Sequence, residues 1–185
     1  MAVKGITEVL AREWRYAGIA EGDLVLLHSN VRRVLMRIRR ADRAAGLEEL
    51  LASFLVALGH EGTLLLPLFN FDFTRGAPFD IRSTPSQMGA LTERGRFHFR
   101  AARTGHAIYS FAAMGALAPR FAGLVNHFSY GSDSPFQMLR DLGGKIAVLD
   151  LSDQDSMTFY HHVEEILQAS YRVHKKFRGE WIGWD

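Results

Sequence analysis

Apolar residues recur along the chain in two spacings that are typical of different elements. Residues 7–17 and 47–58 carry apolar side chains three and four positions apart, which predicts two amphipathic helices. Residues 24–27 and 63–67 are short continuous apolar runs, which are typical of buried parallel strands. The order of strand, helix and strand indicates an α/β unit.

The second half of the chain continues this alternation. Residues 109–114 and 145–151 predict two more strands, and Ser134 followed by Pro135 predicts a helix over residues 136–142. These elements lengthen the α/β pattern without a convincing domain boundary between them.

An aromatic, turn-rich segment separates the two halves. We interpret residues 69–85 as an ordered loop rather than a linker, because four phenylalanines alternate there with polar turn residues. Pro85 and Ser86 then predict the start of a helix, with Ser86 as its N-cap.

Composition excludes several classes of protein. The chain has 185 residues, 48% of them hydrophobic, and a net charge of only +2, which suits one globular domain and not a nucleic-acid-binding protein. Cysteine is absent, so thiol catalysis and thiolate metal sites are excluded. Lys4, Glu8, Arg12 and Glu13 interrupt the N-terminal sequence, and no apolar run is long enough to cross a membrane. We therefore expect a cytoplasmic protein with no membrane association.

Two histidines and two carboxylates lie together in residues 153–165. If a helix begins near Thr158, His161 shares a face with Glu164 at i+3 and with Glu165 at i+4. Such a carboxylate could orient an imidazole that acts as a general base. The spacing alone favours, slightly, an ordinary solvated face at a helix start.

Two further segments could bind a ligand. His28, Ser29 and Asn30 follow the first predicted strand, and ligands of open α/β sheets bind at such strand ends. An ordinary strand-to-helix loop is an equal alternative. Residues 106–110 offer an imidazole, a phenol and a hydroxyl near a strand start, although each of these alone is usually structural.

The densest charge run is basic and covers residues 32–40. A solvated helix face is its usual meaning. The alternatives are a landing site for coenzyme A or for RNA, although no aromatic residues alternate with the arginines as RNA recognition would favour. No spacing in the chain matches a metal site, a dinucleotide fingerprint or a phosphate-binding loop, so we expect no metal.

Six ordered stretches together resemble the aminoglycoside N3-acetyltransferase family, also described as the antibiotic N-acetyltransferase family. The stretches that carry the resemblance are Leu26-Leu-His-Ser29, Gly62-Thr-Leu-Leu-Leu-Pro-Leu-Phe69, Thr84-Pro-Ser-Gln-Met-Gly-Ala-Leu91, His106-Ala-Ile-Tyr-Ser110, Gly131-Ser-Asp-Ser-Pro-Phe136 and Thr158-Phe-Tyr-His-His-Val-Glu164. The last of these resembles the family's Thr-x-x-His-x-x-Glu. Each match is modest, but their joint order is specific.

The resemblance implies a single domain over residues 1–185, a three-layer α/β/α fold with a mixed, largely parallel central sheet. It also implies transfer of acetyl from acetyl-CoA to an amino group of an aminoglycoside or related amino sugar. His161 takes the position of the general base and Glu164 that of its orienting carboxylate. The residues expected near the cofactor are His28, Ser29, Asn30, Arg32 and Ser110. The residues expected near the small-molecule amine are Asp155, Tyr109 and His106.

Two departures from the family pattern affect the acceptor side. Family members that modify aminoglycosides commonly carry His-Pro-Thr-His-Ser, whereas this chain has Ala107 and Tyr109 at the proline and second histidine positions. Family members usually also continue past the position of Asp185, so we expect part of the family fold to be missing. The sequence therefore does not identify the amine that would accept the acetyl group.

Two other functions remain alternatives. One is a catalytically impaired CoA- or sugar-binding module of the same fold, and the other is an RNA-associated protein that uses residues 32–40 and the basic tail. A homodimer is one assembly open to the chain, whose oligomeric state the sequence does not determine.

Overall fold

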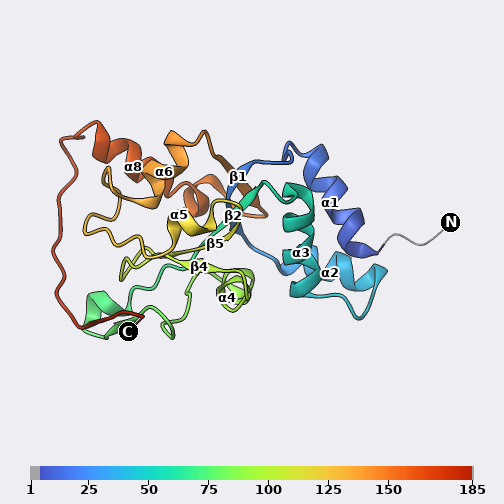
Figure 1. The fold of residues 1–185 in the computed structure, drawn as a ribbon, viewed down its shortest axis with the longest axis horizontal. Coiled ribbons are helices and arrows are strands. Elements are labelled where there is room, and N and C mark those ends of the chain that lie inside the picture. Colours follow the sequence, from blue (N-terminus) through green and yellow to red (C-terminus); the bar gives the residue numbers. More distant parts are fainter. Residues whose placement is uncertain (1–4, 185) are drawn as a thin grey trace.

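A mixed five-stranded sheet forms the centre of the computed structural model, which describes residues 5–184 (Figure 1). Its strand order is β4-β5-β2-β1-β6, and β1 runs parallel to β2 and β6, whereas β5 is antiparallel to β2 and β4. The strands are β1 (Leu24–Ser29), β2 (Thr63–Pro67), β4 (Ala102–Arg103), β5 (Phe111–Gly115) and β6 (Lys145–Leu149). The mixed α/β architecture is therefore confirmed. Lys4 and Asp185, which the sequence argument used, lie outside the described residues.

Helices cover both faces of this sheet. Helices α1 to α4 contribute to the core cluster on one face, and α5 and α6 contribute to the cluster on the other. Figure 1 shows α1, α2 and α3 to the right of the strands and α5 and α6 to their left. The helices are α1 (Ile6–Tyr16), α2 (Arg32–Ala41), α3 (Leu47–Leu58), α4 (Ala90–Arg96), α5 (Ala118–Phe121), α6 (Pro135–Asp141), α7 (Asp153–Ser156) and α8 (Phe159–Ile166). This arrangement gives the three layers that the family resemblance implied.

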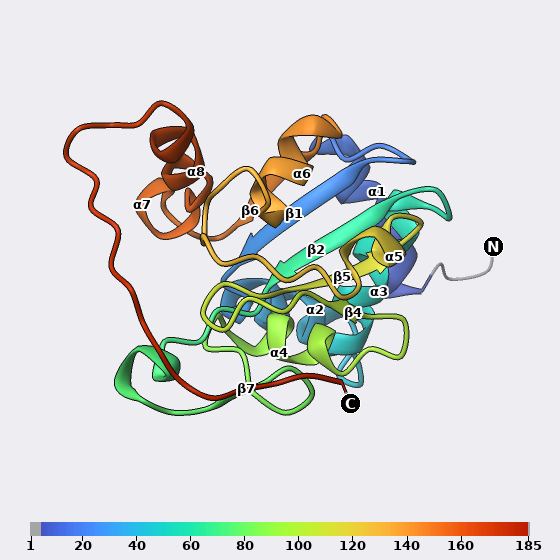
Figure 2. The same cartoon turned by 60° about the vertical axis from the view of Figure 1, so that its left-hand side comes forward.

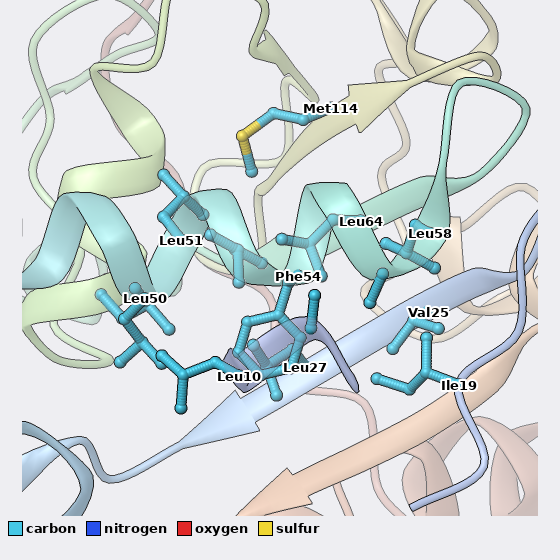
Figure 3. Close-up of a cluster of buried hydrophobic side chains, with 14 of the residues drawn as sticks. Leu10, Ile19, Val25, Leu27, Leu50, Leu51, Phe54, Leu58, Leu64 and Met114 are labelled. Carbon is cyan, nitrogen blue, oxygen red and sulfur yellow. The ribbon is translucent and has the colours of Figure 1, made fainter. Parts of the chain in front are cut away.

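Alternation along β1 divides the core between the two faces. Val25 and Leu27 belong to the cluster beneath α1 and α3, whereas Leu24 and Leu26 belong to the cluster beneath α5 and α6. Figure 3 shows Phe54 of α3 among the side chains of the first cluster. A parallel strand buried on both faces needs such a continuous apolar run, which is why the sequence pattern identified β1.

The pairing of β5 with β2 includes a close approach of the two backbones at Gly115. Gly115 has a φ of 126°, and a Cβ atom there would lie 2.1 Å from the carbonyl oxygen of Gly62. Only glycine tolerates both conditions. The two strands can therefore pair fully, from Thr63 with Gly115 to Pro67 with Phe111.

The helix predicted to begin at Ser86 begins later, at Ala90. Gly89, with a φ of 115°, cannot belong to a right-handed helix. The Ser86 hydroxyl accepts the Met88 N–H at 3.1 Å, a local turn bond, instead of capping a helix. The prediction was wrong because serine supports turns and N-caps by the same bond.

The Ser134 prediction is confirmed. Ser134 is the N-cap of α6, its Oγ accepts the Gln137 N–H at 3.4 Å, and Pro135 is the first helical residue. Residues 69–85 form an ordered loop, as expected, with a 3-10 turn (Asp72–Arg75) and β3 (Phe79–Asp80) inside it.

The chain finishes in an extended segment that crosses to the far side of the molecule. It leaves α8 and reaches β7 (Trp181–Ile182), which pairs in parallel with β3 (Figure 2). The Trp181 Nε1–H donates to the Gly105 carbonyl at 2.7 Å, and this bond anchors β7 to the segment between β4 and β5. None of the described helices is both long and apolar enough to cross a membrane.

Candidate active site

His161 lies on the exposed side of α8, within its first turn. Its Nδ1 atom is 3.0 Å from Oε2 of Glu164, the i+3 contact that the sequence predicted. The imidazole is half exposed, and no described residue hydrogen-bonds to its Nε2 atom. An oriented imidazole with one accessible nitrogen is the arrangement a general base requires.

Glu164 is held from three directions. Besides His161, the Tyr171 hydroxyl donates to Oε1 at 2.9 Å, and Nη1 of Arg172 donates to Oε2 at 2.6 Å. These three hydrogen bonds, led by that from His161, lower the pKa of the Glu164 carboxyl to about 2. The carboxylate is therefore ionised near neutral pH and can act only as an acceptor.

Tyr130 links His161 to the residues expected near the acceptor. Its ring centroid lies 5.2 Å from that of His161 and 4.9 Å from that of Tyr109, which in turn lies 5.8 Å from the His106 ring. Burial raises the pKa of the Tyr130 phenol. The sequence analysis missed Tyr130, and its only signal there is its place beside Gly131 of the Gly-x-x-Ser-Pro-Phe stretch.

Both ring nitrogens of His106 lie within hydrogen-bonding distance of groups of the protein itself. Nδ1 accepts the backbone N–H groups of Ile108 at 3.1 Å and Tyr109 at 3.0 Å, so the proton of the neutral ring lies on Nε2, 3.3 Å from the Ser129 hydroxyl. Burial lowers the pKa of His106 to about 4. His106 therefore shapes the loop that carries Tyr109, and its expected contact with substrate remains a prediction.

Ser110 lies in the core, 1% exposed. Its Oγ atom accepts Nε and Nη2 of Arg103 at 3.3 and 3.1 Å and lies 3.4 Å from the Leu68 carbonyl. Burial lowers the pKa of Arg103 to about 10, which leaves it charged near neutral pH. Since these bonds engage the hydroxyl fully, its predicted contact with a cofactor would have to replace one of them.

The other predicted cofactor residues lie together where β1 ends and α2 begins. His28 Nε2 and Ser29 Oγ are buried without a hydrogen-bond partner, and burial lowers the pKa of His28 to about 4. Asn30 donates its N–H to the Leu149 carbonyl at 2.8 Å and accepts the Arg32 N–H at 3.2 Å. Unsatisfied polar atoms at the carboxyl end of a central strand are typical of a ligand site.

Asp155 lies on α7, between β6 and α8 in the chain. It is exposed, and its Oδ2 atom accepts the Ser152 hydroxyl at 2.7 Å. No described contact joins it to His161, so its expected role toward an amine stays a prediction. Glu165, the other carboxylate of α8, has its Oε1 atom 2.9 Å from Nε2 of His174.

The two adjacent histidines separate into different environments. His162 is 1% exposed, and its Nδ1–H donates to the Tyr130 carbonyl at 2.7 Å, whereas His161 faces outward. Within residues 5–184, no group of three or more histidines and carboxylates could hold a metal ion.

The arginines of α2 form a solvated face. All five lie exposed, Arg33 pairs with Asp150 at 3.0 Å, and Arg37 pairs with Glu13 at 2.6 Å. Such exposed pairs contribute little to stability.

The chain matches known proteins over most of its length. The sequence profile of the family described as aminoglycoside 3-N-acetyltransferase matches residues 26–182. Aminoglycoside N(3)-acetyltransferase VII of Streptomyces paromomycinus is 25% identical over 185 aligned positions, which cover 86% of this chain and 60% of that protein. This chain therefore spans about three fifths of the curated relative's length.

Solved structures share the fold. A structure described as AAC-IIIb in binary complex with CoASH superposes with a TM-score of 0.73 at 26% identity, over 86% of this chain and 64% of that one. The aminoglycoside acetyltransferase AAC(3)-IVa, as apoenzyme, superposes with a TM-score of 0.76 at 23% identity, over 90% of this chain and 63% of that one. With the profile covering well over half of its residues, this chain belongs to the aminoglycoside 3-N-acetyltransferase family.

Proposed function

We propose that this protein is an acyltransferase that moves acetyl from acetyl-CoA to an amino group of an aminoglycoside or related amino sugar, with His161 as general base. The hydrogen bond between His161 and Glu164 carries the proposal. Family membership supports the reaction class. The Streptomyces relative is named as an aminoglycoside N(3)-acetyltransferase, and AAC-IIIb was solved with CoASH.

His161 and Glu164 have different roles in the proposed reaction. An ammonium group is no nucleophile until it loses a proton. The unpartnered Nε2 atom of His161 takes that proton, while Nδ1–H donates to Glu164. The ionised carboxylate fixes this tautomer and offsets the positive charge that the ring acquires.

The end of β1 suits the co-substrate, which supplies the acetyl group as a thioester. His28 is neutral near pH 7, so its buried Nε2 and the Ser29 hydroxyl offer uncharged hydrogen bonds to amide or carbonyl groups. The exposed guanidinium of Arg32 at the start of α2 would hold a phosphate. The buried polar atoms of His28 and Ser29, with the Arg32 cation close by in the chain, fit a ligand such as acetyl-CoA that carries both amide and phosphate groups.

A polar cavity beside α8 is the proposed acceptor subsite. It has a volume of about 390 Å³ and is lined by Glu164, Glu165, Gln168, Ala169, Ser170, Arg172 and His174. Glu164 and Glu165 bring negative charge to this cavity, where Arg172 and His174 pair with them, and Glu164 connects the cavity to the candidate base. His106, Tyr109 and Asp155, which the sequence placed near the amine, do not line it. Because Tyr109 departs from the family pattern, we leave the identity of the amino sugar to experiment.

A direct experiment tests the reaction. The purified chain is incubated with acetyl-CoA and a panel of aminoglycosides and simpler amino sugars, and products are identified by mass. We expect acetylated product, equal in amount to the CoA released, with at least one amine. Release of CoA at the same rate with and without amines would contradict the proposal.

One observation favours a second function, a CoA- or sugar-binding protein without turnover. Nη1 of Arg172 also lies 3.0 Å from Nδ1 of His161, and a guanidinium can only donate. If that bond formed, the ring proton would lie on Nε2, which could not then act as a base. Calorimetric binding of CoA without any product from the amine panel would support this alternative.

Location and assembly are further parts of the proposal. We propose a cytoplasmic protein, where acetyl-CoA is available, and a homodimer as the assembly to test by light scattering.

A further inference from the structure

Among residues 5–184, Arg172 is the one charged group that contacts His161 from outside α8. Its Nη1 atom, Oε2 of Glu164 and Nδ1 of His161 form a triangle with sides of 2.6, 3.0 and 3.0 Å. In the most favourable arrangement, Oε2 of Glu164 accepts the N–H groups of both Arg172 and His161, because charge-assisted bonds to an ionised oxygen are the strongest available. The guanidinium then lies beside the imidazole without bonding to it.

The position of Arg172 is well defined. Its side chain is 20% exposed, its guanidinium carbon lies 5.4 Å from the centroid of the Tyr130 ring, and Nε lies 3.8 Å from Oε2 of Glu165. A cation over an aromatic face with carboxylates at its edge is held against rotation. These contacts place the Arg172 guanidinium beside His161.

The charges around His161 oppose one another. The Glu164 carboxylate is negative and the Arg172 guanidinium is positive, and each lies 3.0 Å from Nδ1 of His161. The other titratable groups at this corner are Glu165 on α8, Tyr171 and His174 after it, and Tyr130 before α6. Glu165 contacts Arg172 and His174, and Tyr171 contacts Glu164, so Arg172 is the group that offsets the charge of Glu164 at His161.

We propose that Arg172 is a positioning residue of this site, which fixes Glu164 and holds a positive charge against the Nδ1 side of the His161 ring. The inference rests on the proposed function, in which the unprotonated ring is the active form. It adds a residue outside the Thr-x-x-His-x-x-Glu stretch, eight positions beyond Glu164.

Titration of the His161 imidazole by NMR tests this without any need for turnover. The spectrum of His161→Ala assigns the signal, and its half-protonation pH is compared in wild type, Arg172→Gln and Arg172→Lys. We expect the midpoint to rise by about one unit in Arg172→Gln, because the like charge is removed, and to stay near wild type in Arg172→Lys. Arg172→Met, which keeps a long side chain over Tyr130, is a second neutral variant if Arg172→Gln does not fold.

Activity provides the second measurement. If the wild type acetylates an amine, the acid limb of kcat/KM should move to higher pH in the neutral variants, with about tenfold lower activity below the limb. Arg178→Gln is the matched control, because Arg178 is exposed on the same segment, and it should titrate as wild type does. Equal midpoints in wild type and both neutral variants would overturn the role of Arg172. A wild type without turnover would instead refute only the proposed function.

Discussion

The Nδ1 atom of His106 accepts the backbone N–H of Tyr109 at 3.0 Å. The bond fixes the loop between β4 and β5, so the Tyr109 ring packs edge-on against Phe69 with the centroids 5.0 Å apart. His106 must be neutral at Nδ1 to accept. The position of a residue expected near the acceptor thus depends on a buried histidine that remains unprotonated.

Stability should fall between pH 6.5 and pH 4. The folded state lowers the pKa of both His28 and His106 to about 4, so the unfolded chain binds more protons across this window. Their stabilising contribution is complete above pH 6.5 and is lost as the pH falls toward 4, by at most about 3 kcal/mol for each histidine. Urea unfolding at each half unit of pH measures the loss.

Substitution separates the two histidines. His106→Gln should lower stability at pH 7.5, because two backbone N–H groups lose their acceptor geometry, and should flatten the pH dependence below 6.5. His60→Gln, at a 92% exposed side chain, is the control and should change neither. An unchanged slope in His106→Gln would show that this ring is not held neutral.

Ser110→Ala should act on stability more than on binding of CoA. The change leaves two N–H groups of the buried Arg103 without their acceptor, which costs about 1–3 kcal/mol. Ser132→Ala, at an exposed serine nearby in the chain, should cost less than about 0.5 kcal/mol. Chemical denaturation gives the stability and calorimetry gives the affinity. A tenfold loss of CoA affinity in a stable Ser110→Ala would restore the cofactor role predicted from the sequence.

Phe54→Ala should be among the most destabilising changes in the first core cluster. The ring is 2% exposed and stacks on Trp14 with centroids 4.7 Å apart and planes 5° apart, so its removal leaves a cavity beneath α1. The expected cost is about 3–5 kcal/mol by chemical denaturation. Phe99→Ala, at a ring that is 83% exposed, should stay close to wild type. Equal effects of the two changes would contradict the assigned core.

His28→Gln and Ser29→Ala should each weaken CoA binding. Both residues have a buried polar atom without a partner in the free protein, so a ligand that satisfies it gains a hydrogen bond without displacing another. We expect about a tenfold rise in Kd for each, since one such bond is worth about 1.4 kcal/mol. Ser132→Ala again serves as the control in calorimetry. Wild-type affinity in both variants would remove the end of β1 from the cofactor site.

The regular elements could be predicted from the sequence because their signals are local. The apolar run of β1, the twelve-residue α3 and the Ser134 cap were each read from spacing or composition and lie where they were expected. The start of α4 was misplaced because the serine signal is ambiguous, whereas a positive φ at Gly89 is decided by the tertiary structure. The antiparallel pairing of β5 with β2 is a relationship between distant segments that no local pattern reports.

The site was predicted only in part, for a related reason. The bond from His161 to Glu164 follows from helix geometry and could be predicted. Arg172 and Tyr130 reach His161 from an extended segment and a loop, so only the fold brings them there. The engagement of Ser110 by Arg103 and the use of both nitrogens of His106 are likewise tertiary.

Acetyl transfer by His161→Ala tests the central claim most directly. Transfer from acetyl-CoA to the best amine of the panel is followed by mass, with calorimetry for CoA on the same preparation and His60→Ala as the control at an exposed histidine. The proposal predicts a fall in kcat of about 10²–10⁴-fold in His161→Ala, with CoA affinity unchanged and with His60→Ala at the wild-type rate. Transfer by His161→Ala at the wild-type rate would contradict the assignment of His161 as the base.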